Sequence, residues 1–352
     1  MIRVGLVPGD GVGPEVVGEA RRVLEAVAAA GLVDLSFREF PHGADHFLAT
    51  GETLGDEAFA ALRDEVDVIL LGAVGDRRVP DNRHAHDILL GLRFRLDLYV
   101  NFRPARLRDA RFSPLRAASD APIDFVIFRE NTEGAYSGAG GGIRGGTPQE
   151  IAVGENFATR WGVERIVRAA FEYAERTDRR LVTLADKANA IPQVYGLWRR
   201  VFDEVAAEFP SVEAERQYVD ALAMDLVRRP ARYGVIVTDN LFGDILSDLA
   251  AELVGGLGLA PSANYRPDGP GLFEPVHGSA PDLAGRGEAN PLAAILSAAL
   301  LLEHVGAGEG ARAVDAAVTA ALRADVVTPD LGGSRTTSEV GQWIADRIGS
   351  AG

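Results

Sequence analysis

Residues 233–248 read YGVIVTDNLFGDILSD, and this stretch joins two elements of different periodicity. The run 233–238 is short, apolar and rich in β-branched residues, which is typical of a buried strand. Asp244 and Asp248 follow at a spacing of four, so a helix here directs both carboxylates from one face toward one point. Just beyond the carboxyl end of a strand is also where α/β sheets bind their ligands.

This carboxylate pair suits a hard divalent cation. Mg²⁺ and Mn²⁺ prefer oxygen ligands and usually keep open positions for water and substrate, as a metal-assisted reaction requires. Asp244 and Asp248 are therefore candidate metal ligands. The alternative is a solvated acidic face, because acidic pairs at this spacing are common on exposed helices.

The same alternation of strand and helix runs through the chain. Strand-like runs lie at 2–7, 66–71, 123–128, 180–184 and 234–238, and amphipathic stretches at 14–29, 161–176 and 194–208. This order predicts an α/β fold with a mostly parallel sheet covered by helices. At 352 residues the chain exceeds the size at which one core usually suffices, so we expect two lobes.

Charge and composition limit the partners and the compartment. The net charge of −15 argues against a nucleic acid or an anionic membrane as partner. The absence of cysteine excludes disulfides and thiolate chemistry and fits a reducing cytoplasm. The chain opens as a strand, without signal-peptide anatomy, and the longest apolar stretch, 292–302, is too short to span a bilayer. We therefore expect a cytoplasmic protein.

Three arginines stand at or near the ends of strand-like segments, namely Arg93, Arg103 and Arg129. Guanidinium groups bind carboxylates through two parallel hydrogen bonds, so three that converge can hold a dicarboxylate within an acidic protein. Each of them alone would more often be a surface salt-bridge partner.

A glycine-rich turn, PGDGVGPE at 8–15, follows the first strand. It resembles a Rossmann fingerprint, but the spacing is G-x-G-x-G and Pro14 follows at once, so the usual pyrophosphate cradle is poorly matched. A tight turn with positive φ, followed by proline at the helix start, explains these residues equally well.

Together with FEPVHGSAPD at 273–282, these motifs resemble the β-decarboxylating dehydrogenases of the isocitrate and isopropylmalate dehydrogenase family, from the first strand nearly to the C-terminus. The resemblance implies two α/β lobes that share a large mixed sheet and are not a Rossmann fold. It implies a cofactor-side lobe of 1–99 and 253–352, and a central lobe of 100–252. Within the latter, about 134–158 would form an arm that pairs with a partner subunit. A flexible linker is the alternative for the glycine tract 137–146.

The resemblance also assigns catalytic roles. Lys187 would accept the proton of the substrate hydroxyl, and Tyr136 would donate a proton to the enolate left by loss of CO₂. Asp220 would join Asp244 and Asp248 as a metal ligand, and the resemblance implies that Lys187 and Asp220 enter from the neighbouring subunit of a homodimer. Tyr136 as a half-buried aromatic and Lys187 as an ion-pair partner of Asp186 are the structural alternatives.

The implied reaction is oxidation of a 2-hydroxy acid by hydride transfer to a nicotinamide, followed by loss of the β-carboxylate, with Mg²⁺ or Mn²⁺ as Lewis acid. The implied cofactor-binding residues are His277, Gly278, Ser279, Ala280, Asp282 and Asn290. Asp282 favours NAD, because a carboxylate accepts hydrogen bonds from ribose hydroxyls and repels the 2′-phosphate of NADP. A loop or N-cap role is the alternative for Asp282.

The arginines would bind the malate carboxylates, and the substituent on C3 would contact Leu89, Leu90 and Ala190. Leu89 and Leu90, with Ile88, cannot pair with a third carboxylate, which disfavours isocitrate and favours 3-isopropylmalate, an intermediate of leucine biosynthesis. Isopropylmalate enzymes often carry Glu near 85–86 and Val at the position of Ala190. D-malate, tartrate, homoisocitrate and other 3-alkylmalates therefore remain open.

Two other classes of function are disfavoured. A metal-dependent phosphoryl-transfer enzyme would be expected to carry a G-x-x-x-x-G-K-[ST] loop, and the sequence has none. A regulatory subunit without activity usually loses catalytic residues, whereas the arginines, Tyr136, Lys187 and the three aspartates are all present.

Overall fold

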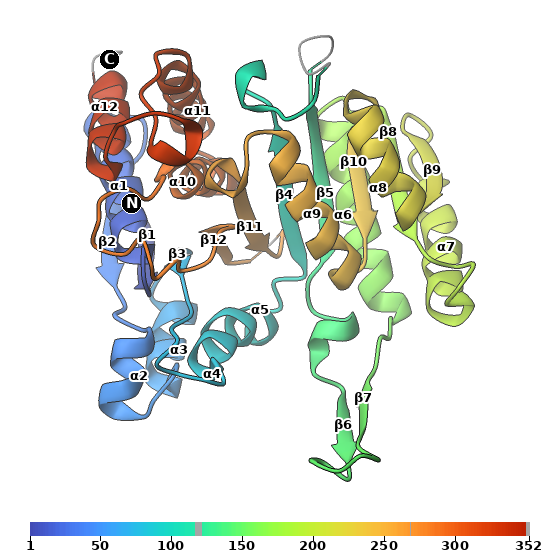
Figure 1. Ribbon diagram of the computed structural model, residues 1–352. Helices are drawn as coiled ribbons and strands as arrows, with labels where there is room; N and C mark the ends of the chain where they lie inside the picture. Colours follow the sequence, from blue (N-terminus) through green and yellow to red (C-terminus); the bar gives the residue numbers. More distant parts are fainter. Residues whose placement is uncertain (117–121, 268, 350–352) are drawn as a thin grey trace. The chain divides into compact units, whose positions relative to one another are not determined.

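The computed structural model describes residues 1–116, 122–267 and 269–349 (Figure 1). Its contacts divide the described chain into two units. The first contains residues 1–98, 107–116 and the segment from 251 onward, and the second contains 99–106 and 122–250. The boundaries fall close to those expected for the two lobes, but 107–116 belongs to the first unit, which the resemblance did not suggest.

The first unit contains a five-stranded part of the sheet. Its order is β2 (Leu35–Glu39), β1 (Ile2–Gly9), β3 (Val68–Ala73), β12 (Gly271–Pro275) and β11 (Pro261–Tyr265). Neighbouring strands are parallel except β11, which runs antiparallel to β12. All six residues of β3 are buried, because a parallel strand covered on both faces needs a continuous apolar sequence.

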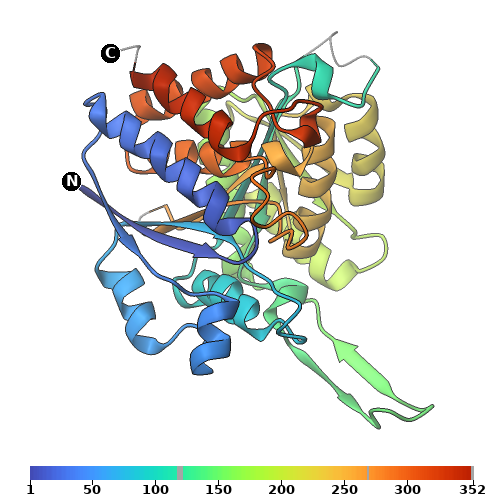
Figure 2. The ribbon, with the colours of Figure 1, turned by 60° about the vertical axis from the view of Figure 1, so that its left-hand side comes forward.

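Helices cover both faces of this part of the sheet (Figures 1 and 2). One face carries α1 (Gly13–Ala29), α10 (Leu292–His304), α11 (Gly308–Arg323) and α12 (Thr337–Gly349). The other carries α2 (Ala44–Thr50), α3 (Asp56–Asp64), α4 (Arg83–Ala85), the π-helical turn η1 (His86–Leu90) and α5 (Gly91–Arg95). Helix α10 is buried almost all round by its own unit, which accounts for its apolar sequence.

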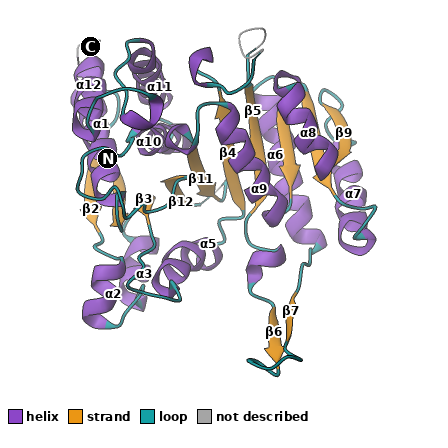
Figure 3. Cartoon of the chain, viewed as in Figure 1, coloured by secondary structure: helices purple, strands orange, loops and turns teal. Residues whose placement is uncertain are grey.

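The second unit contains the other five-stranded part. Its order is β4 (Val100–Arg106), β5 (Asp124–Glu130), β10 (Val235–Thr238), β8 (Leu181–Asp186) and β9 (Glu213–Tyr218). Only β4 is antiparallel to its neighbour β5 within this unit. Its helices are α6 (Arg160–Arg176), α7 (Pro192–Ala206), α8 (Val219–Arg228) and most of α9 (Asn240–Leu253). Both units are therefore α/β with mostly parallel strands, as predicted (Figure 3).

Residues 137–146 do not form a flexible linker. Strand β6 (Gly140–Ile143) pairs antiparallel with β7 (Ile151–Gly154), and this hairpin projects from the second unit (Figure 1). A Cβ at Gly140 would overlap the carbonyl oxygen of Val153, so close pairing requires glycine there. The linker interpretation is wrong, and pairing of the hairpin with a second subunit stays a prediction.

Short helical turns complete the described chain: η2 (Ala110–Phe112), η3 (Gly134–Ser137), η4 (Pro230–Arg232), η5 (Leu257–Leu259) and η6 (Pro329–Leu331). In the described residues, no helix combines the length and the apolar character that crossing a membrane would require.

Candidate active site

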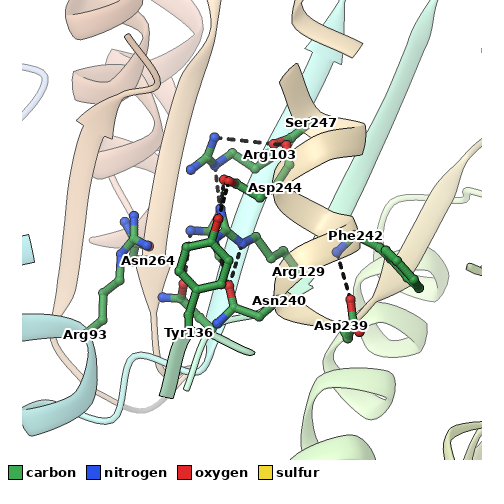
Figure 4. Close-up of polar contacts among 12 residues, drawn as sticks. Arg93, Arg103, Arg129, Tyr136, Asp239, Asn240, Phe242, Asp244, Ser247 and Asn264 are labelled. Carbon is green, nitrogen blue, oxygen red and sulfur yellow. Dashed lines mark hydrogen bonds and ion pairs between the residues drawn. The ribbon is translucent and has the colours of Figure 1, made fainter. Parts of the chain in front are cut away.

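Helix α9 begins directly after β10, and a buried aspartate fixes its first turn. Oδ1 of Asp239 accepts a 2.8 Å hydrogen bond from the backbone N–H of Phe242 (Figure 4). Its Oδ2 accepts a 2.5 Å hydrogen bond from the hydroxyl of Tyr195 on α7. Burial raises the pKa of Asp239. Because both oxygens have donors, this carboxylate holds the start of the helix that carries Asp244 and Asp248.

Asp244 is the centre of a polar cluster on α9 (Figure 4). One carboxylate oxygen contacts the guanidinium of Arg129, and the other accepts a 2.6 Å hydrogen bond from the hydroxyl of Tyr136. Arg129 also donates hydrogen bonds of 3.0 and 2.7 Å to Oδ1 of Asn240. A Cβ at Gly243 would overlap the Arg129 side chain, so this glycine allows α9 to lie directly on the arginine.

Arg103 approaches the same helix from β4 (Figure 4). Its Nε donates a 2.7 Å hydrogen bond to Oδ1 of Asn101, and one terminal nitrogen lies 3.4 Å from the hydroxyl of Ser247. Ser247 lies between Asp244 and Asp248 along α9. Four of the predicted site residues, Arg103, Arg129, Tyr136 and Asp244, thus come together, while Asp248 is exposed on the same helix.

Arg93 lies in the first unit, on α5, and is buried against two polar side chains. One of its terminal nitrogens donates a 2.8 Å hydrogen bond to Oε1 of Glu274, which also accepts one of 2.8 Å from Asn264. In this ion pair, Arg93 and Glu274 neutralise each other's buried charge. Among the described residues, Nε of Arg93 is buried without a hydrogen-bond partner, and such a donor fits an anionic ligand.

Lys187 and Asp220 form an ion pair of their own. Nζ of Lys187 lies 2.9 Å from Oδ2 of Asp220, and this hydrogen bond lowers the pKa of the aspartate. Asp186 is instead held by Arg199 through two hydrogen bonds of 2.8 and 2.9 Å, so the interpretation of Lys187 as its partner is wrong.

A complete metal site does not form within the described part of one chain. No group of three or more His, Asp or Glu side chains is placed there to hold a metal ion. The structure therefore does not bring Asp220 together with Asp244 and Asp248, and a site made from all three stays a prediction that requires a second subunit.

The glycine-rich turn lies against the segment expected to bind the cofactor. The backbone N–H of Val12 donates a 2.8 Å hydrogen bond to the carbonyl oxygen of Ser279. A Cβ at Gly11 would overlap that same oxygen, and Gly9 and Gly11 both have positive φ angles, 75° and 59°. Gly11 is therefore required by the turn and by its close approach to Ser279, and Gly9 by the turn and by its close approach to Ala73.

His277 offers an acceptor that fits an adenine amino group. Its Nδ1 lies 3.0 Å from the carbonyl oxygen of Gly278, which can only accept, so Nδ1 carries the hydrogen. Burial lowers the pKa of the ring, which keeps Nε2 unprotonated. Among the described residues, Nε2 is buried and lacks a partner, so the site fits a nucleotide.

The other predicted cofactor residues are placed in different ways. Gly278 and Ala280 lie in the loop on either side of Ser279. Asp282 is 76% exposed and pairs with Arg77 at 3.3 Å. Asn290 donates a 2.9 Å hydrogen bond to Asp330 and accepts one of 3.0 Å from Leu292, so its amide holds the loop at the start of α10.

The residues predicted to form the substrate pocket differ in their exposure. Leu89 and Leu90 are partly buried on the π-helical turn η1, an irregular type of turn that is frequent at functional sites. Ile88, which precedes them, is fully buried in the core of the first unit with Leu92. Ala190 is exposed in the turn after β8.

Comparison with known proteins adds the decisive observation. The sequence model of isocitrate/isopropylmalate dehydrogenases matches residues 3–344. The chain belongs to this family. A 3-isopropylmalate dehydrogenase of Beutenbergia cavernae is 50% identical over 99% of this chain and 98% of its own length, and one of Clavibacter sepedonicus is 51% identical over 97% of both.

Solved structures agree with this family. The isocitrate dehydrogenase from Methylococcus capsulatus superposes with a TM-score of 0.88 at 37% identity, covering 99% of this chain and 100% of that one. The TT0538 protein from Thermus thermophilus superposes with a TM-score of 0.87 at 36% identity, covering 99% of this chain and 68% of that one. The predicted fold is confirmed, and the chain is a decarboxylating dehydrogenase that requires a nucleotide cofactor and a divalent metal.

For this family member, sequence reasoning missed the residues that hold the site in place. Asn240 could have been found, because it precedes Asp244 by four positions and so shares its helix face. Glu274 could not, because it meets Arg93 across 181 positions of sequence. Tyr195 was equally hidden, because nothing in its helical segment indicates a buried carboxylate partner from another element.

Proposed function

We propose that the enzyme oxidises 3-isopropylmalate with NAD and decarboxylates it to 4-methyl-2-oxopentanoate, a step of leucine biosynthesis. The observation that carries the proposal is the likeness over nearly the full length, at about 50% identity, to proteins named 3-isopropylmalate dehydrogenase. The partly buried Leu89 and Leu90 support an apolar substituent on the malate. A cytoplasmic location is part of the proposal.

The proposal assigns the malate carboxylates to Arg93, Arg103 and Arg129. The buried Nε of Arg93 supports its role as a donor to an anion. Arg129 is only 1% exposed and is fixed by Asn240 and Asp244, so it is already oriented before any ligand arrives. Guanidinium groups held in this way bind a carboxylate with little further loss of side-chain freedom.

Proton transfer is assigned to Lys187 and Tyr136. Lys187, as the neutral amine, takes the proton of the substrate hydroxyl as the hydride leaves, and the 2.9 Å contact of Nζ with Asp220 holds the nitrogen in place for this role. Tyr136 returns a proton to the carbon that loses CO₂, and its hydrogen bond to Asp244 orients the phenol. NAD would accept the hydride, and its adenosine end is assigned to the His277–Asn290 loop.

Asp244 and Asp248, with Asp220 from a second copy, would hold Mg²⁺ or Mn²⁺, whose Lewis acidity would stabilise the negative charge that develops during decarboxylation. The carboxylate oxygens of these side chains suit such a hard cation. The pairing of Lys187 with Asp220, apart from the described cluster around Asp244, supports the homodimer in which two chains complete each site.

Exposed apolar side chains support the same homodimer. Those on the β6–β7 hairpin are Ile143, Ile151 and Val153, and those on helices α8 and α9 are Met224, Val227 and Ile245. Large apolar side chains exposed together are typical of a surface that a second subunit covers.

The test is the rate of formation of reduced nicotinamide, followed by absorbance, with Mg²⁺ and a panel of 2-hydroxy acids. The panel contains 3-isopropylmalate, isocitrate, D-malate, tartrate and homoisocitrate. We expect the highest kcat/KM for 3-isopropylmalate, and we expect a chelator to abolish the rate until Mg²⁺ is restored. A higher kcat/KM for any other acid of the panel would overturn the substrate assignment.

A further inference from the structure

A buried histidine links the substrate-pocket segment to the glycine-rich turn. His84 lies on α4 with no exposed surface, and its Nε2 is 2.9 Å from Oδ2 of Asp10. A carboxylate oxygen accepts, so Nε2 is the donor in this bond. The ring of Phe47, from α2, stacks on the imidazole with centroids 6.1 Å apart and an interplanar angle of 20°. The ring is therefore held on its edge and on its face.

Asp10 binds two further parts of the same unit. Its Oδ1 accepts a 2.6 Å hydrogen bond from the backbone N–H of Ala44, at the start of α2. Its Oδ2 accepts one of 2.8 Å from the N–H of Gly75, in the loop after β3. A carboxylate that is 7% exposed needs such donors, because a buried charge without hydrogen bonds is strongly disfavoured. One side chain thus fixes the turn, α2, the loop after β3 and α4.

Both ends of the His84–Asp10 bond lead to residues of the proposed site. Asp10 lies beside Gly11 and Val12, which contact Ser279 in the loop assigned to the cofactor. From His84, the chain continues through α4 and η1 into α5, which carries Arg93. The π-helical turn between them departs from regular α-helix, so regular helix geometry alone does not determine where Leu89, Leu90 and Arg93 lie.

We propose that His84 is a positioning residue for hydride transfer. Its hydrogen bond to Asp10 fixes segment 83–93, which contacts the substrate, against the turn that contacts the cofactor loop. The bond thereby sets the distance between the reacting carbon and the nicotinamide. This inference rests on the proposed function, and it adds a role for a side chain that touches neither reactant. Small errors in such distances are costly, since a misplacement of about 1 Å can slow an enzyme roughly 100-fold.

Two amide substitutions distinguish the effect of losing the His84–Asp10 hydrogen bond from the effect of losing the buried imidazole ring. In His84→Gln, the amide nitrogen reaches approximately the position of Nε2 and can donate to Asp10. In His84→Asn, the side chain carries the same amide group but is too short to reach Asp10. We expect His84→Asn to lower kcat/KM for 3-isopropylmalate about tenfold or more, because even a misplacement below about 1 Å slows the reaction, and His84→Gln to restore most of it.

The matched control is His304→Asn. His304 is partly buried in the same unit. Its Nε2 lies 3.3 Å from the carbonyl oxygen of Gly269, and its ring packs against Tyr265 and Phe273, none of which belongs to the glycine-rich turn. The Tm of every variant is measured by circular dichroism. Its kcat and KM are measured for both 3-isopropylmalate and NAD. A merely structural role would lower Tm equally in both amides and leave the kinetic constants of the folded enzyme unchanged.

Three results would overturn the proposal: unchanged kinetics in folded His84→Asn, failure of folded His84→Gln to exceed His84→Asn, or an equal kinetic loss in His304→Asn. If His84→Asn does not fold, His84→Leu, which retains apolar volume but has no donor, replaces it in the same comparison. Inactivity of the unmodified enzyme toward 3-isopropylmalate would instead defeat the proposed function, and the amide comparison would then use the best acid of the panel.

Discussion

The hydroxyl of Tyr136 donates a 2.6 Å hydrogen bond to Oδ2 of Asp244. This bond joins the assigned proton donor to an assigned metal ligand. The second oxygen of Asp244 contacts Arg129, so the same carboxylate also orients an assigned substrate ligand. A change at Asp244 should therefore disturb metal affinity, proton donation and substrate binding together.

Asp244→Asn should weaken metal binding and lower turnover, because a neutral amide cannot replace a carboxylate against a hard dication. We expect kcat to fall by about 10²-fold or more, as for loss of one preorganised electrostatic group. Initial rates measured against Mg²⁺ concentration test this. Asp248→Asn should have a smaller effect if that exposed residue is a water-mediated ligand. Full activity of Asp244→Asn at limiting Mg²⁺ would remove Asp244 from the site.

Mixed subunits should recover activity that neither variant has alone. Lys187→Ala and Tyr136→Phe should each be inactive, but a heterodimer would contain one site with both intact residues if Lys187 enters from the neighbouring subunit. The rate is measured after the two variants exchange subunits, with exchange checked by mass-tagged chains. Unmixed variants, treated in the same way, are the control. Proven exchange without recovered activity would show that the sites are not shared.

Substitutions in the assigned pocket should alter which malate is used without abolishing use of all of them. Leu90→Glu places a charge beside the C3 substituent, so it should disfavour the isopropyl group. Ala190→Val should favour smaller substituents, because it fills space in the same assigned pocket. The kcat/KM values for the acid panel measure both changes. The same ranking in both variants as in the unmodified enzyme would place the pocket elsewhere.

Glu130 should make stability depend on pH in a defined direction. It is buried at the end of β5, and burial raises its pKa from 4.5 to about 6, in spite of hydrogen bonds from Thr132 and Glu133. The folded state therefore binds this proton more tightly than the unfolded chain. The stabilisation is full below pH 4.5 and is lost as pH rises through 6.

The free energy of unfolding should accordingly fall by about 2 kcal/mol across this window, the equivalent of the pKa shift. Glu130→Gln should remove that part of the slope, and Glu57→Gln, on the exposed surface of α3, should keep it. Denaturant unfolding at a series of pH values measures the difference. Parallel pH profiles for Glu130→Gln and the unmodified enzyme would contradict the prediction.

The cofactor preference should follow the charge at Asp282. NAD should be preferred, because the carboxylate accepts hydrogen bonds from the ribose hydroxyls of NAD and repels the 2′-phosphate of NADP. Asp282→Lys combined with Leu283→Tyr should shift the preference toward NADP. The pair of Asp282 with Arg77 is highly exposed and contributes little by itself, so Arg77→Ala is the control and should leave the preference nearly unchanged. Comparable kcat/KM for NAD and NADP in the unmodified enzyme would defeat the assignment.

Parts of the fold and site could be predicted because they depend on local spacing. The apolar run of β10 and the spacing of Asp244 and Asp248 predict a strand followed by a helix with both carboxylates on one face, and α9 has this form. The edge strands β2 and β9 gave no such signal. A strand exposed at the edge carries polar residues, so its sequence lacks the apolar run that marks a buried strand.

The sequence by itself determined the fold class, the elements that carry the assigned side chains and the glycines that their turns require. Only the tertiary structure decided which polar groups meet, as in the pairs of Tyr136 with Asp244, Arg93 with Glu274 and Lys187 with Asp220. Periodicity reports which face of an element is apolar. A buried charge, by contrast, takes whichever partner the packing of distant segments brings within hydrogen-bond distance, and that choice leaves no local trace in the sequence.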